Sequence, residues 1–337
     1  MQNYLEKVIE GQNLTYYEIK EIIEKLLNDE IDSIKFGAFL ALLRKKGESL
    51  EEIKAFIDTF LERSKKIYLS NEFSIDTCGT GGDSKGTFNI STVSSIILSS
   101  FDIKVVKHGN RGITSRSGSA DLMEQLGIDI NANQEKLEEG IEKIGFGFVF
   151  APNFHPAMKK VAPIRKSLGI KTVFNILGPV LNPAPINYQV VGTFDLDSQN
   201  KIFNALNGRR KRYAVVHSDD GLDEISISSS TKILENSLGI TKEYFIEPED
   251  FGVNRYDLSE IKSEDPKQNA EITLSIFEGI ESPFYYATQI NCAFCLYILG
   301  LTDNLVEAAK QVERNIKNGL VMKKFNDIKN FYKLGGQ

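Results

Sequence analysis

Hydrophobic and polar positions follow two different patterns along this chain, and the change falls near Ser70. In the first 65 residues, apolar residues recur at the spacing of one helix face, most clearly over 31–43 and 53–61. Thr15 and Ser49 each precede a glutamate by three residues, which is the capping-box signature of a helix start. The pattern predicts a small helical domain over 1–70, which needs to dock on the rest of the chain or on a second subunit to be stable.

Beyond Ser70, short β-like runs alternate with helical stretches. Strands are predicted over 73–77, 103–107, 146–150, 188–192 and 213–217. This alternation is typical of an α/β domain, here 71–337, with a central, mostly parallel sheet that binds ligands at the carboxyl ends of its strands. A helical stretch over about 155–180 interrupts the rhythm, and we expect it to return to the N-terminal bundle. The last third is predicted to be mostly helical, most clearly over 286–299 and 304–319.

A glycine-rich run, DTCGTGGDSKGTFNIST, follows the first predicted strand at 76–92. Its glycines allow positive φ, so that peptide N–H groups can face an anion. The polar residues at its end offer cap-type oxygens and free N–H groups where an apolar helix over 93–101 begins. The run matches neither the Walker pattern nor the dinucleotide-binding fingerprint. On this evidence alone, a phosphate site and a simple turn are equal alternatives.

A second loop of the same character, KHGNRGITSRSGSAD, follows the second predicted strand at 107–121. It carries cations at 107, 111 and 116 and hydroxyls at 114, 115, 117 and 119. Lys107 can act as a point charge on a phosphate, and Ser117 or Ser119 is predicted to cap the following helix. The alternative is a solvated turn with a helix cap.

Two further segments carry candidate chemistry. Asp223 and Glu224 follow a glycine turn, and adjacent carboxylates suit a Mg²⁺ ion shared with substrate phosphates, although such pairs are also common on surfaces. Asp219 and Asp220 are further candidate ligands or turn residues. On the 155–180 segment, Arg165 could hold a substrate carboxylate in a bidentate fork, with Pro179 as an apolar wall; a solvated basic helix face is the alternative.

Composition narrows the class of protein. The net charge of −6 argues weakly against a general nucleic-acid binder, and the basic run at 209–212 is predicted to lie at a helix C-terminus. No apolar run reaches the ~18 residues needed to cross a bilayer, and the acidic start does not resemble a secretory signal. Three cysteines cannot form a disulfide framework, so we expect a cytoplasmic protein, with Cys292 and Cys295 in the core.

Taken together, these motifs resemble those of the anthranilate phosphoribosyltransferase family, within the superfamily of nucleoside phosphorylases and phosphoribosyltransferases. The resemblance covers nearly the whole chain. It rests on GTGGD at 79–83, NIST at 89–92, KHGNR at 107–111, GSAD at 118–121, HPAM and APIR within 155–165, NILGPVLNP at 175–183, and GLDE at 221–224. Departures are small, with Gly112 in place of the usual serine or alanine and Ser218 where glycine is common, and they affect loop detail only.

The resemblance implies a reaction and a set of site residues. The reaction is the Mg²⁺-dependent transfer of the phosphoribosyl group of 5-phosphoribosyl 1-pyrophosphate to the amine of anthranilate, a step of tryptophan biosynthesis. The implied phosphoribosyl pyrophosphate site consists of Gly79, Gly82, Asp83, Thr87, Asn89, Ile90, Ser91, Thr92, Lys107 and Ser119. The implied anthranilate site consists of Gly79, His108, Asn110, His155, Arg165 and Pro179, with the two histidines on its access path. Ser91, Asp223 and Glu224 are the implied ligands of Mg²⁺, with two ions expected.

Physical chemistry favours the same mechanism. A pyrophosphate leaving group needs charge neutralisation more than the reaction needs a base, because the attacking aromatic amine is already neutral. We therefore expect direct displacement with inversion at ribose C1, without a covalent intermediate, and closure between the two domains. The family is typically a homodimer joined through its helical domain. Two alternatives remain, a pyrimidine nucleoside phosphorylase and a non-catalytic relative that binds nucleic acid through the basic run at 209–212.

Overall fold

The computed structural model describes residues 1–70, 73–112, 117–263 and 265–333. Its first part is helical, as the apolar spacing predicts, and contains α1 (Gln2–Ile9), α2 (Tyr16–Leu27), α3 (Ser33–Lys46) and α4 (Leu50–Glu62). Both capping boxes are present, because the side chains of Thr15 and Ser49 accept from the N3 backbone N–H and the N3 glutamates accept from the cap N–H. Local sequence signals therefore define where α2 and α4 begin.

The second part of the chain is built on one seven-stranded sheet in the order β3-β2-β1-β4-β5-β6-β7. The neighbours from β3 to β5 are parallel, and β6 and β7 are antiparallel to their neighbours. This mostly parallel sheet confirms the predicted fold class. The strands are β1 (Ser74–Gly79), β2 (Lys104–Gly109), β3 (Phe146–Phe150), β4 (Tyr188–Gly192), β5 (Arg212–Ser218), β6 (Thr231–Ser237) and β7 (Ile240–Ile246).

The hairpin of β6 and β7 is missing from the sequence prediction, which expects mostly helix in the last third of the chain. Its turn lies at Leu238 and Gly239, and Gly239 has a φ of 89°. Buried and exposed side chains do not alternate along β7, because most of its residues are exposed at the edge of the sheet. Glu235 on β6 is buried because Arg212 on β5 pairs with it at 2.8 Å. A tertiary contact therefore stabilises a strand whose own sequence is weakly apolar.

Helices cover both faces of the sheet. They are α5 (Ile90–Leu98), α6 (Ser119–Gln125), α7 (Gln134–Ile144), α8 (Ala151–Phe154), α9 (Met158–Leu168), α10 (Phe174–Leu177), α11 (Leu196–Leu206), α12 (Pro266–Phe277), α13 (Pro283–Ile298), α14 (Leu305–Lys317) and α15 (Leu320–Phe331). Short 3₁₀ turns are η1 (Ser99–Phe101), η2 (Gly178–Val180), η3 (Pro248–Phe251) and η4 (Leu258–Ile261). No helix within the described ranges is long and apolar enough to cross a membrane.

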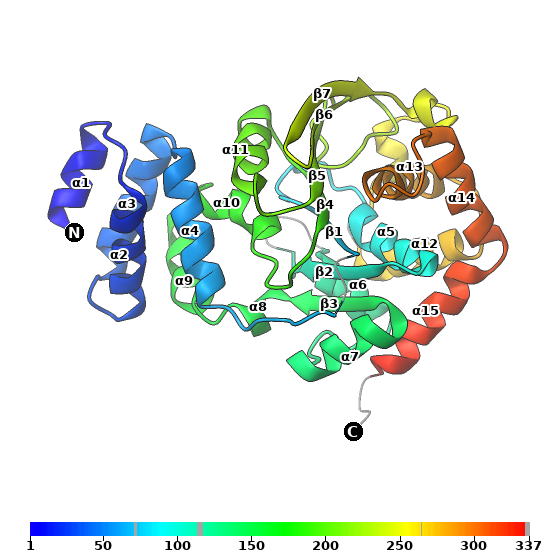
Figure 1. Cartoon of the computed structure of the whole chain (residues 1–337), viewed down its shortest axis with the longest axis horizontal. Coiled ribbons are helices and arrows are strands. Elements are labelled where there is room, and N and C mark those ends of the chain that lie inside the picture. Colours follow the sequence, from blue (N-terminus) through cyan, green and yellow to red (C-terminus); the bar gives the residue numbers. More distant parts are fainter. Residues whose placement is uncertain (71–72, 113–116, 264, 334–337) are drawn as a thin grey trace.

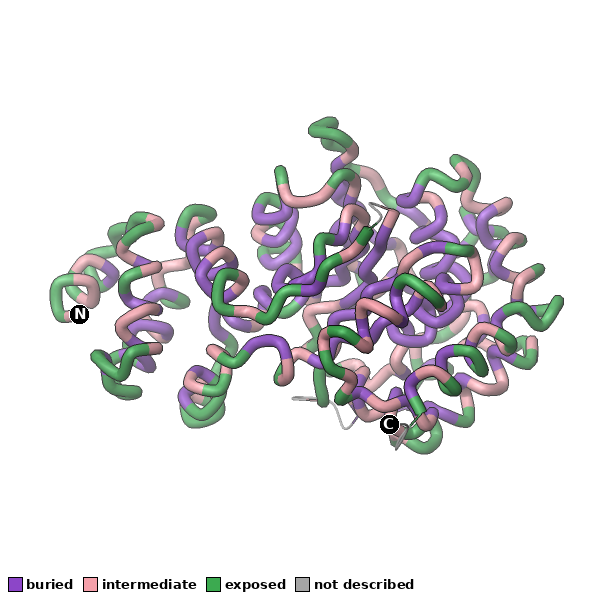
Figure 2. Tube along the Cα trace, turned by 60° about the horizontal axis from the view of Figure 1, so that its bottom comes forward, coloured by how far each residue is buried: buried purple, intermediate pink, exposed green. Residues whose placement is uncertain are grey.

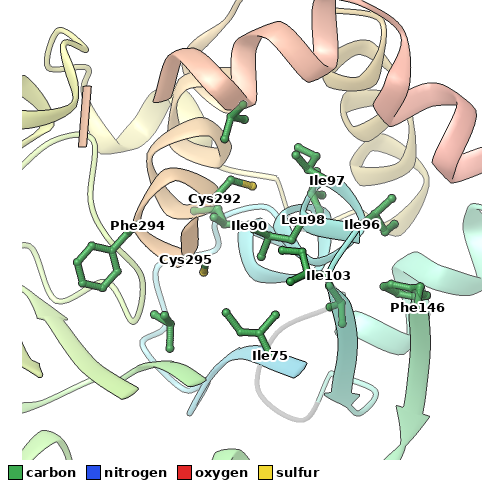
Figure 3. Packing of buried hydrophobic residues seen from close by; sticks show 14 of the residues in the cluster. Ile75, Ile90, Ile96, Ile97, Leu98, Ile103, Phe146, Cys292, Phe294 and Cys295 are labelled. Atoms are coloured by element: carbon green, nitrogen blue, oxygen red, sulfur yellow. The ribbon is translucent and has the colours of Figure 1, made fainter. Parts of the chain in front are cut away.

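Two hydrophobic cores lie on opposite faces of the sheet. One core packs α5, α13 and their neighbours against the sheet, and Cys292 and Cys295 are buried in it, as predicted (Figure 3). The other core joins α1–α4 with α9–α11 and with residues of β4 and β5. Figure 1 shows α1–α4 at one end of the molecule, with α9 packed into this end against α3 and with α10 between the bundle and the sheet. Figure 2 shows that buried segments alternate with intermediate and exposed ones along the helices of the bundle.

The 155–180 segment contacts the N-terminal helices. α9 packs on α3, and Phe174 of α10 lies edge-on to the rings of Phe56 and Phe60 from α4. Lys160 donates to the carbonyl of Leu27, which closes the end of α2. The segment at 155–180 is thereby attached to the helical bundle. Its two ends connect to strands of the sheet, β3 before it and β4 after it.

Candidate active site

A cavity of about 620 Å³ opens at the carboxyl ends of β1 and β2, where the chain order reverses between β1 and β4. Ligands of open α/β sheets bind at such a reversal, because the loops of the two halves separate there. The further candidates Asp219 and Asp220 do not line this cavity. Every site residue that the family resemblance implies does line it: Gly79, Gly82, Asp83, Thr87, Asn89, Ile90, Ser91, Thr92, Lys107, His108, Asn110, Ser119, His155, Arg165, Pro179, Asp223 and Glu224. The four motif segments are thus brought together in space.

The glycine loop after β1 has the backbone that its composition predicts. Gly81 and Gly82 have φ values of 65° and 76°, a region that favours glycine. α5 begins after Asn89, but the Asn89 side chain does not cap it. Its carboxamide instead accepts from the Ser117 hydroxyl at 3.0 Å and donates to the Ser117 carbonyl at 3.2 Å. Asn89 therefore joins the two glycine-rich loops and leaves the start of α5 without a side-chain cap.

Lys107 is the buried cation of the site. It lies on β2, is 2% exposed, and donates to the Thr77 carbonyl at 2.6 Å and the Ser91 hydroxyl at 3.2 Å. A buried ammonium needs such partners, because desolvation disfavours the charged form. The lysine that a Walker loop carries at its end is absent here, and Lys107 on the next strand supplies a buried cation instead.

Asp223 and Glu224 lie beneath the glycine loop. The N–H of Gly81 donates to Asp223 Oδ2 at 2.6 Å, and the N–H of Ser91 donates to Glu224 Oε1 at 3.2 Å. Burial raises the pKa of both carboxyls, and the nearby Asp83 raises that of Asp223 further. Asp220 has a different role, because its carboxylate accepts from the hydroxyls of Ser226 and Ser228 and shapes the turn.

The chemistry of these donors fits a hard divalent cation. Asp223 and Glu224 have raised pKa values, and the negative charge of Asp223 raises that of Glu224. Among the described residues, no lysine or arginine forms an ion pair with either carboxylate, so a cation bound between them would remove their mutual repulsion. The Ser91 hydroxyl is a third oxygen nearby, at the start of α5. Within the described ranges, no three His, Cys, Asp or Glu side chains form a preformed metal cluster. Such an ion would therefore need water or substrate oxygens to complete its shell, as is usual for Mg²⁺.

The loop after β2 differs from its prediction in two respects. Arg111 pairs with Asp121 at 3.0 Å and Glu124 at 2.6 Å, so this cation already has anionic partners within the protein. The predicted capping of α6 by Ser117 or Ser119 is wrong, because Gly118 is the N-cap residue and Asp121 accepts from its N–H. The sequence does not predict this role of Asp121, because a glycine N-cap leaves only half of the capping-box signature. The candidate residues 114–116 lie outside the described residues.

Ser119 instead fixes the position of Asn110. Its hydroxyl accepts from the Asn110 N–H at 3.0 Å and donates to the Asn110 carbonyl at 3.1 Å. Gly109 allows this approach, since a Cβ there would lie 2.4 Å from the Ser119 hydroxyl. The end of β2 and the start of α6 are thereby held together at the cavity wall.

Two buried histidines form part of the opposite wall. The rings of His108 and His155 lie 5.2 Å apart, edge to face. Burial lowers their pKa values to about 3 and about 4, so both are neutral at pH 7. His108 Nδ1 lies 3.1 Å from the Gly178 carbonyl, which can only accept, so Nδ1 carries the proton of the neutral ring. His108 therefore holds the loop after α10.

Arg165 is a desolvated cation on α9 with no carboxylate partner in the described part of the chain. Burial alone lowers its pKa. Its guanidinium lies 5.4 Å from the ring centre of Phe174, and both residues line the cavity. An unpaired guanidinium beside an aromatic ring and Pro179 suits a planar ligand with a carboxylate.

Close packing in the site depends on two glycines at strand ends. A Cβ at Gly79 would lie 2.3 Å from Asp223 Oδ2, and a Cβ at Gly192 would lie 1.6 Å from the Asp223 carbonyl oxygen. Glycine at both positions lets the loop that carries Asp223 lie against β1 and β4. Gly192 was not among the predicted site residues, because it belongs to none of the motifs and its partner is 31 residues away in the sequence.

Two known family models match the helical part and the α/β part of the chain separately. Residues 2–64 match the family model described as "Glycosyl transferase family, helical bundle domain", and residues 71–322 match "Glycosyl transferase family, a/b domain". The fold and the site thus define a glycosyl transferase with a helical and an α/β part.

Relatives of known name narrow the family. The chain is 52% identical over 335 residues to an anthranilate phosphoribosyltransferase of Caldicellulosiruptor saccharolyticus, with 99% of each chain covered, and 42% identical to one of Methanosarcina acetivorans, with 98% of this chain and 90% of that one covered. The crystal structure of that enzyme from Thermus thermophilus superposes with a TM-score of 0.91 at 34% identity, covering 98% of this chain and 99% of that one. The chain belongs to the anthranilate phosphoribosyltransferase family, as its motifs indicate.

A further structural relative carries ligands. The Saccharomyces cerevisiae anthranilate phosphoribosyltransferase in complex with phosphoribosyl pyrophosphate and Mg superposes with a TM-score of 0.91 at 27% identity, covering 98% of this chain and 97% of that one. That relative therefore binds both the sugar donor and the metal on the same fold.

Proposed function

We propose that this chain transfers the phosphoribosyl group of 5-phosphoribosyl 1-pyrophosphate to the amine of anthranilate, with release of pyrophosphate, as a step of tryptophan biosynthesis. One observation carries the proposal. A single cavity combines a glycine loop, a buried lysine and a carboxylate pair with an apolar wall and an unpaired guanidinium. The first three suit a metal-bound diphosphate, and the last two suit an aromatic carboxylate.

The donor half of the site is assigned to the loops after β1 and β2. The residues assigned to phosphoribosyl pyrophosphate are Gly79, Gly82, Asp83, Thr87, Asn89, Ile90, Ser91, Thr92, Lys107 and Ser119. Peptide N–H groups of the glycine loop and the α5 start would bind phosphate oxygens, and Lys107 would add a full positive charge beside them. A Mg²⁺ ion bound by Asp223, Glu224 and Ser91 would neutralise the departing pyrophosphate, and two such ions are expected.

The acceptor half is assigned to the wall between β2 and α9. Arg165 would bind the anthranilate carboxylate, while Asn110 and the Gly79 backbone position its ring and amine. Pro179 would form the apolar side of this half, and His108 and His155 would line the access path. Both histidines are neutral at pH 7, so they offer hydrogen-bonding walls without a charge that would compete with Arg165 for the carboxylate.

The residues act by orientation and electrostatics. The amine of anthranilate is neutral at pH 7 and attacks ribose C1 directly, so the protein needs no covalent nucleophile. Positive charge develops on the ribose while negative charge develops on the leaving oxygens, where Lys107 and the loop N–H groups stabilise it. We infer displacement with inversion at C1, and trapping of a ribosyl-enzyme adduct would contradict this. Movement of α9, which carries Arg165, towards the glycine loop would exclude water.

Three further parts of the proposal concern organisation. We propose that residues 1–70 form the helical domain, to which the segment at about 155–180 returns. Residues 71–337 form the α/β domain. We also propose a homodimer joined through the helical domain, in the cytoplasm, without nucleic-acid or membrane partners. The basic run supports the absence of nucleic acid, because Arg209 pairs with Asp58, Arg210 with Gln189 and Arg212 with Glu235 within the chain.

The decisive assay follows the fluorescence of anthranilate in the presence of phosphoribosyl pyrophosphate and Mg²⁺. We expect the fluorescence to fall with time, and to stay constant when EDTA removes the metal. Metal-independent cleavage of pyrimidine nucleosides by phosphate would instead indicate a nucleoside phosphorylase. Retention on DNA at physiological salt, without turnover, would indicate the nucleic-acid-binding alternative.

A further inference from the structure

A buried polar network lies directly beneath the Pro179 wall of the cavity. Gln189 on β4 is 0% exposed and faces Asp76 of β1 across the parallel strand pair. Its amide donates to the Pro179 carbonyl at 2.6 Å, and its Oε1 accepts from Arg210 Nε at 2.9 Å. Gln189 thus connects the basic segment before β5 to the cavity wall.

The other end of the same turn is held by a second amide. Asn182 donates to Asp76 Oδ2 at 3.0 Å and to the Val106 carbonyl at 2.8 Å, and it accepts from the Ala184 N–H at 3.1 Å. Asp76 in turn accepts from the His108 N–H at 3.3 Å. The turn over 178–182 is therefore attached to β1, β2 and β4 through side chains, and none of these side chains reaches the cavity surface.

We propose that Gln189, oriented by Arg210, is a positioning residue that sets the Pro179 wall for an aromatic acceptor. The inference rests on the proposed function of the cavity. Pro179 can form a backbone hydrogen bond only through its carbonyl, because proline has no N–H to donate. Of the hydrogen bonds that the described residues make to this carbonyl, the one from Gln189 is the shortest, and the contact from Cys78 Sγ at 3.9 Å is weak.

The position of Gln189 predicts an effect on binding of the aromatic acceptor substrate rather than of the phosphoribosyl donor. The turn lines the cavity through Gly178, Pro179 and Leu181, together with Phe174 and the Arg165 guanidinium that lies 5.4 Å from the Phe174 ring centre. The Gln189 amide also lies 3.5 Å from Asp76 Oδ2 and 3.7 Å from Cys78 Sγ, both on β1 just before the loop. It makes no hydrogen bond to the described residues 79–92 or to the carboxylate pair. A shift of the Pro179 wall would therefore change the fit of a planar ring more than the fit of phosphates.

The test compares two buried glutamines. Gln189→Met keeps the length of the side chain and removes its hydrogen bonds, so the wall loses its anchor. Gln199→Met is the matched control, because Gln199 is also 0% exposed and donates to two backbone carbonyls, those of Val215 and Lys232, at 2.9 Å each, away from the cavity. For Gln189→Met we expect the KM for anthranilate to rise about tenfold, with the KM for phosphoribosyl pyrophosphate changed by less than about twofold. For Gln199→Met we expect neither KM to move by more than about twofold, although its melting temperature falls similarly.

Each outcome decides the matter. If Gln189→Met does not fold, Arg210→Lys replaces it as the test, because it keeps the charge but loses the Nε donor, and a rise of about threefold in the anthranilate KM alone is then expected. An active wild type whose Gln189 and Arg210 variants leave the anthranilate KM unchanged, or shift both KM values equally, overturns the inference alone. Equal shifts in the Gln199 control also overturn it. A folded wild type without turnover overturns both the proposed function and the inference that rests on it.

Discussion

Replacement of Gly192 by alanine is the most direct test of how the carboxylate pair is positioned. Gly192 is the last residue of β4, and the carbonyl of Asp223 lies directly over its Cα. Alanine at this position places a methyl group where backbone atoms already lie, rather than the movable end of a side chain. The loop that carries Asp223 and Glu224 must therefore move away from the sheet.

The size of this movement follows from the structure. The added Cβ would lie 1.6 Å from the Asp223 oxygen and 2.3 Å from its carbonyl carbon. Ordinary contact begins at about 3.4 Å, so the loop must move by nearly 2 Å, which is comparable to a whole Mg–O bond of about 2.1 Å. Loss of such positioning typically lowers metal affinity by about 10- to 100-fold. Overpacking also costs about 1–3 kcal/mol of stability.

The assay measures the Mg²⁺ concentration that gives the half-maximal rate at saturating substrates, together with Mn²⁺ binding followed by electron paramagnetic resonance. Gly140→Ala is the matched control, because its Cβ would lie 1.9 Å from the Tyr332 hydroxyl oxygen, far from the cavity. We expect both variants to lose stability, and only Gly192→Ala to require about 10- to 100-fold more metal.

The result that would refute this reasoning is equally specific. If Gly192→Ala binds Mn²⁺ as tightly as the wild type while its stability falls, the loop absorbs the methyl group without moving the carboxylates. If Gly140→Ala lowers the affinity for the metal to the same extent, the effect arises from general destabilisation. In either case the clearance at Gly192 does not position the ligands.

Three further predictions concern charge and burial. Arg165→Ala should raise the KM for anthranilate at least about tenfold and the KM for phosphoribosyl pyrophosphate much less, and equal effects in steady-state kinetics would sink the assignment of Arg165. Because the pKa values of His108 and His155 are lowered to about 3 and about 4, the neutral rings stabilise the fold above pH ~6.5, and this contribution is lost as the pH falls towards 4. Urea unfolding should show a loss of about 5 kcal/mol over that window, because each of the two histidines contributes about 1.4 kcal/mol per pH unit. About half of this loss is expected in His155→Asn, and an unchanged slope would contradict the burial argument. Glu52 is 0% exposed and binds Lys46 Nζ and the N–H groups of Leu14 and Ser49, so Glu52→Ala should cost about 3 kcal/mol in urea unfolding, and a loss below about 1 kcal/mol would show that water replaces these contacts.

The elements that the sequence predicts well are those whose signal is local. The capping boxes at Thr15 and Ser49 lie where expected, and β3 and β4 have the predicted bounds because their apolar runs are short and end at turns. The hairpin of β6 and β7 has no such signal, since Glu235 is buried only through a partner on β5. Its strand character is set by the tertiary structure.

The site shows the same distinction. Lys107 and the Asp223–Glu224 pair stand out in the sequence because their residue types suit phosphate and metal, and they line one cavity. Asp76, Gln189 and Gly192 do not stand out, because a buried carboxylate, a strand glutamine and a strand-end glycine are each ordinary alone. Their importance comes from contacts across the β1–β4 pair, which are distant in the sequence. The sequence also does not show that Arg111 is already paired within the protein. Its carboxylate partners lie in the next helix, α6, and are brought to it by the fold.

The pairing of β1 with β4 also has a consequence for how the chain folds. Asp76 and Gln189 are 113 positions apart, and β2 and β3 are inserted between their strands in the sequence. Closing so long a loop is entropically costly, so this parallel contact is expected to form after the local units on either side of it. An intermediate with β1–β3 formed would already carry the glycine loop but would lack the wall, the carboxylate pair and Arg165. Substrate binding should therefore appear only at the last stage of sheet assembly, both on the ribosome and on dilution from denaturant.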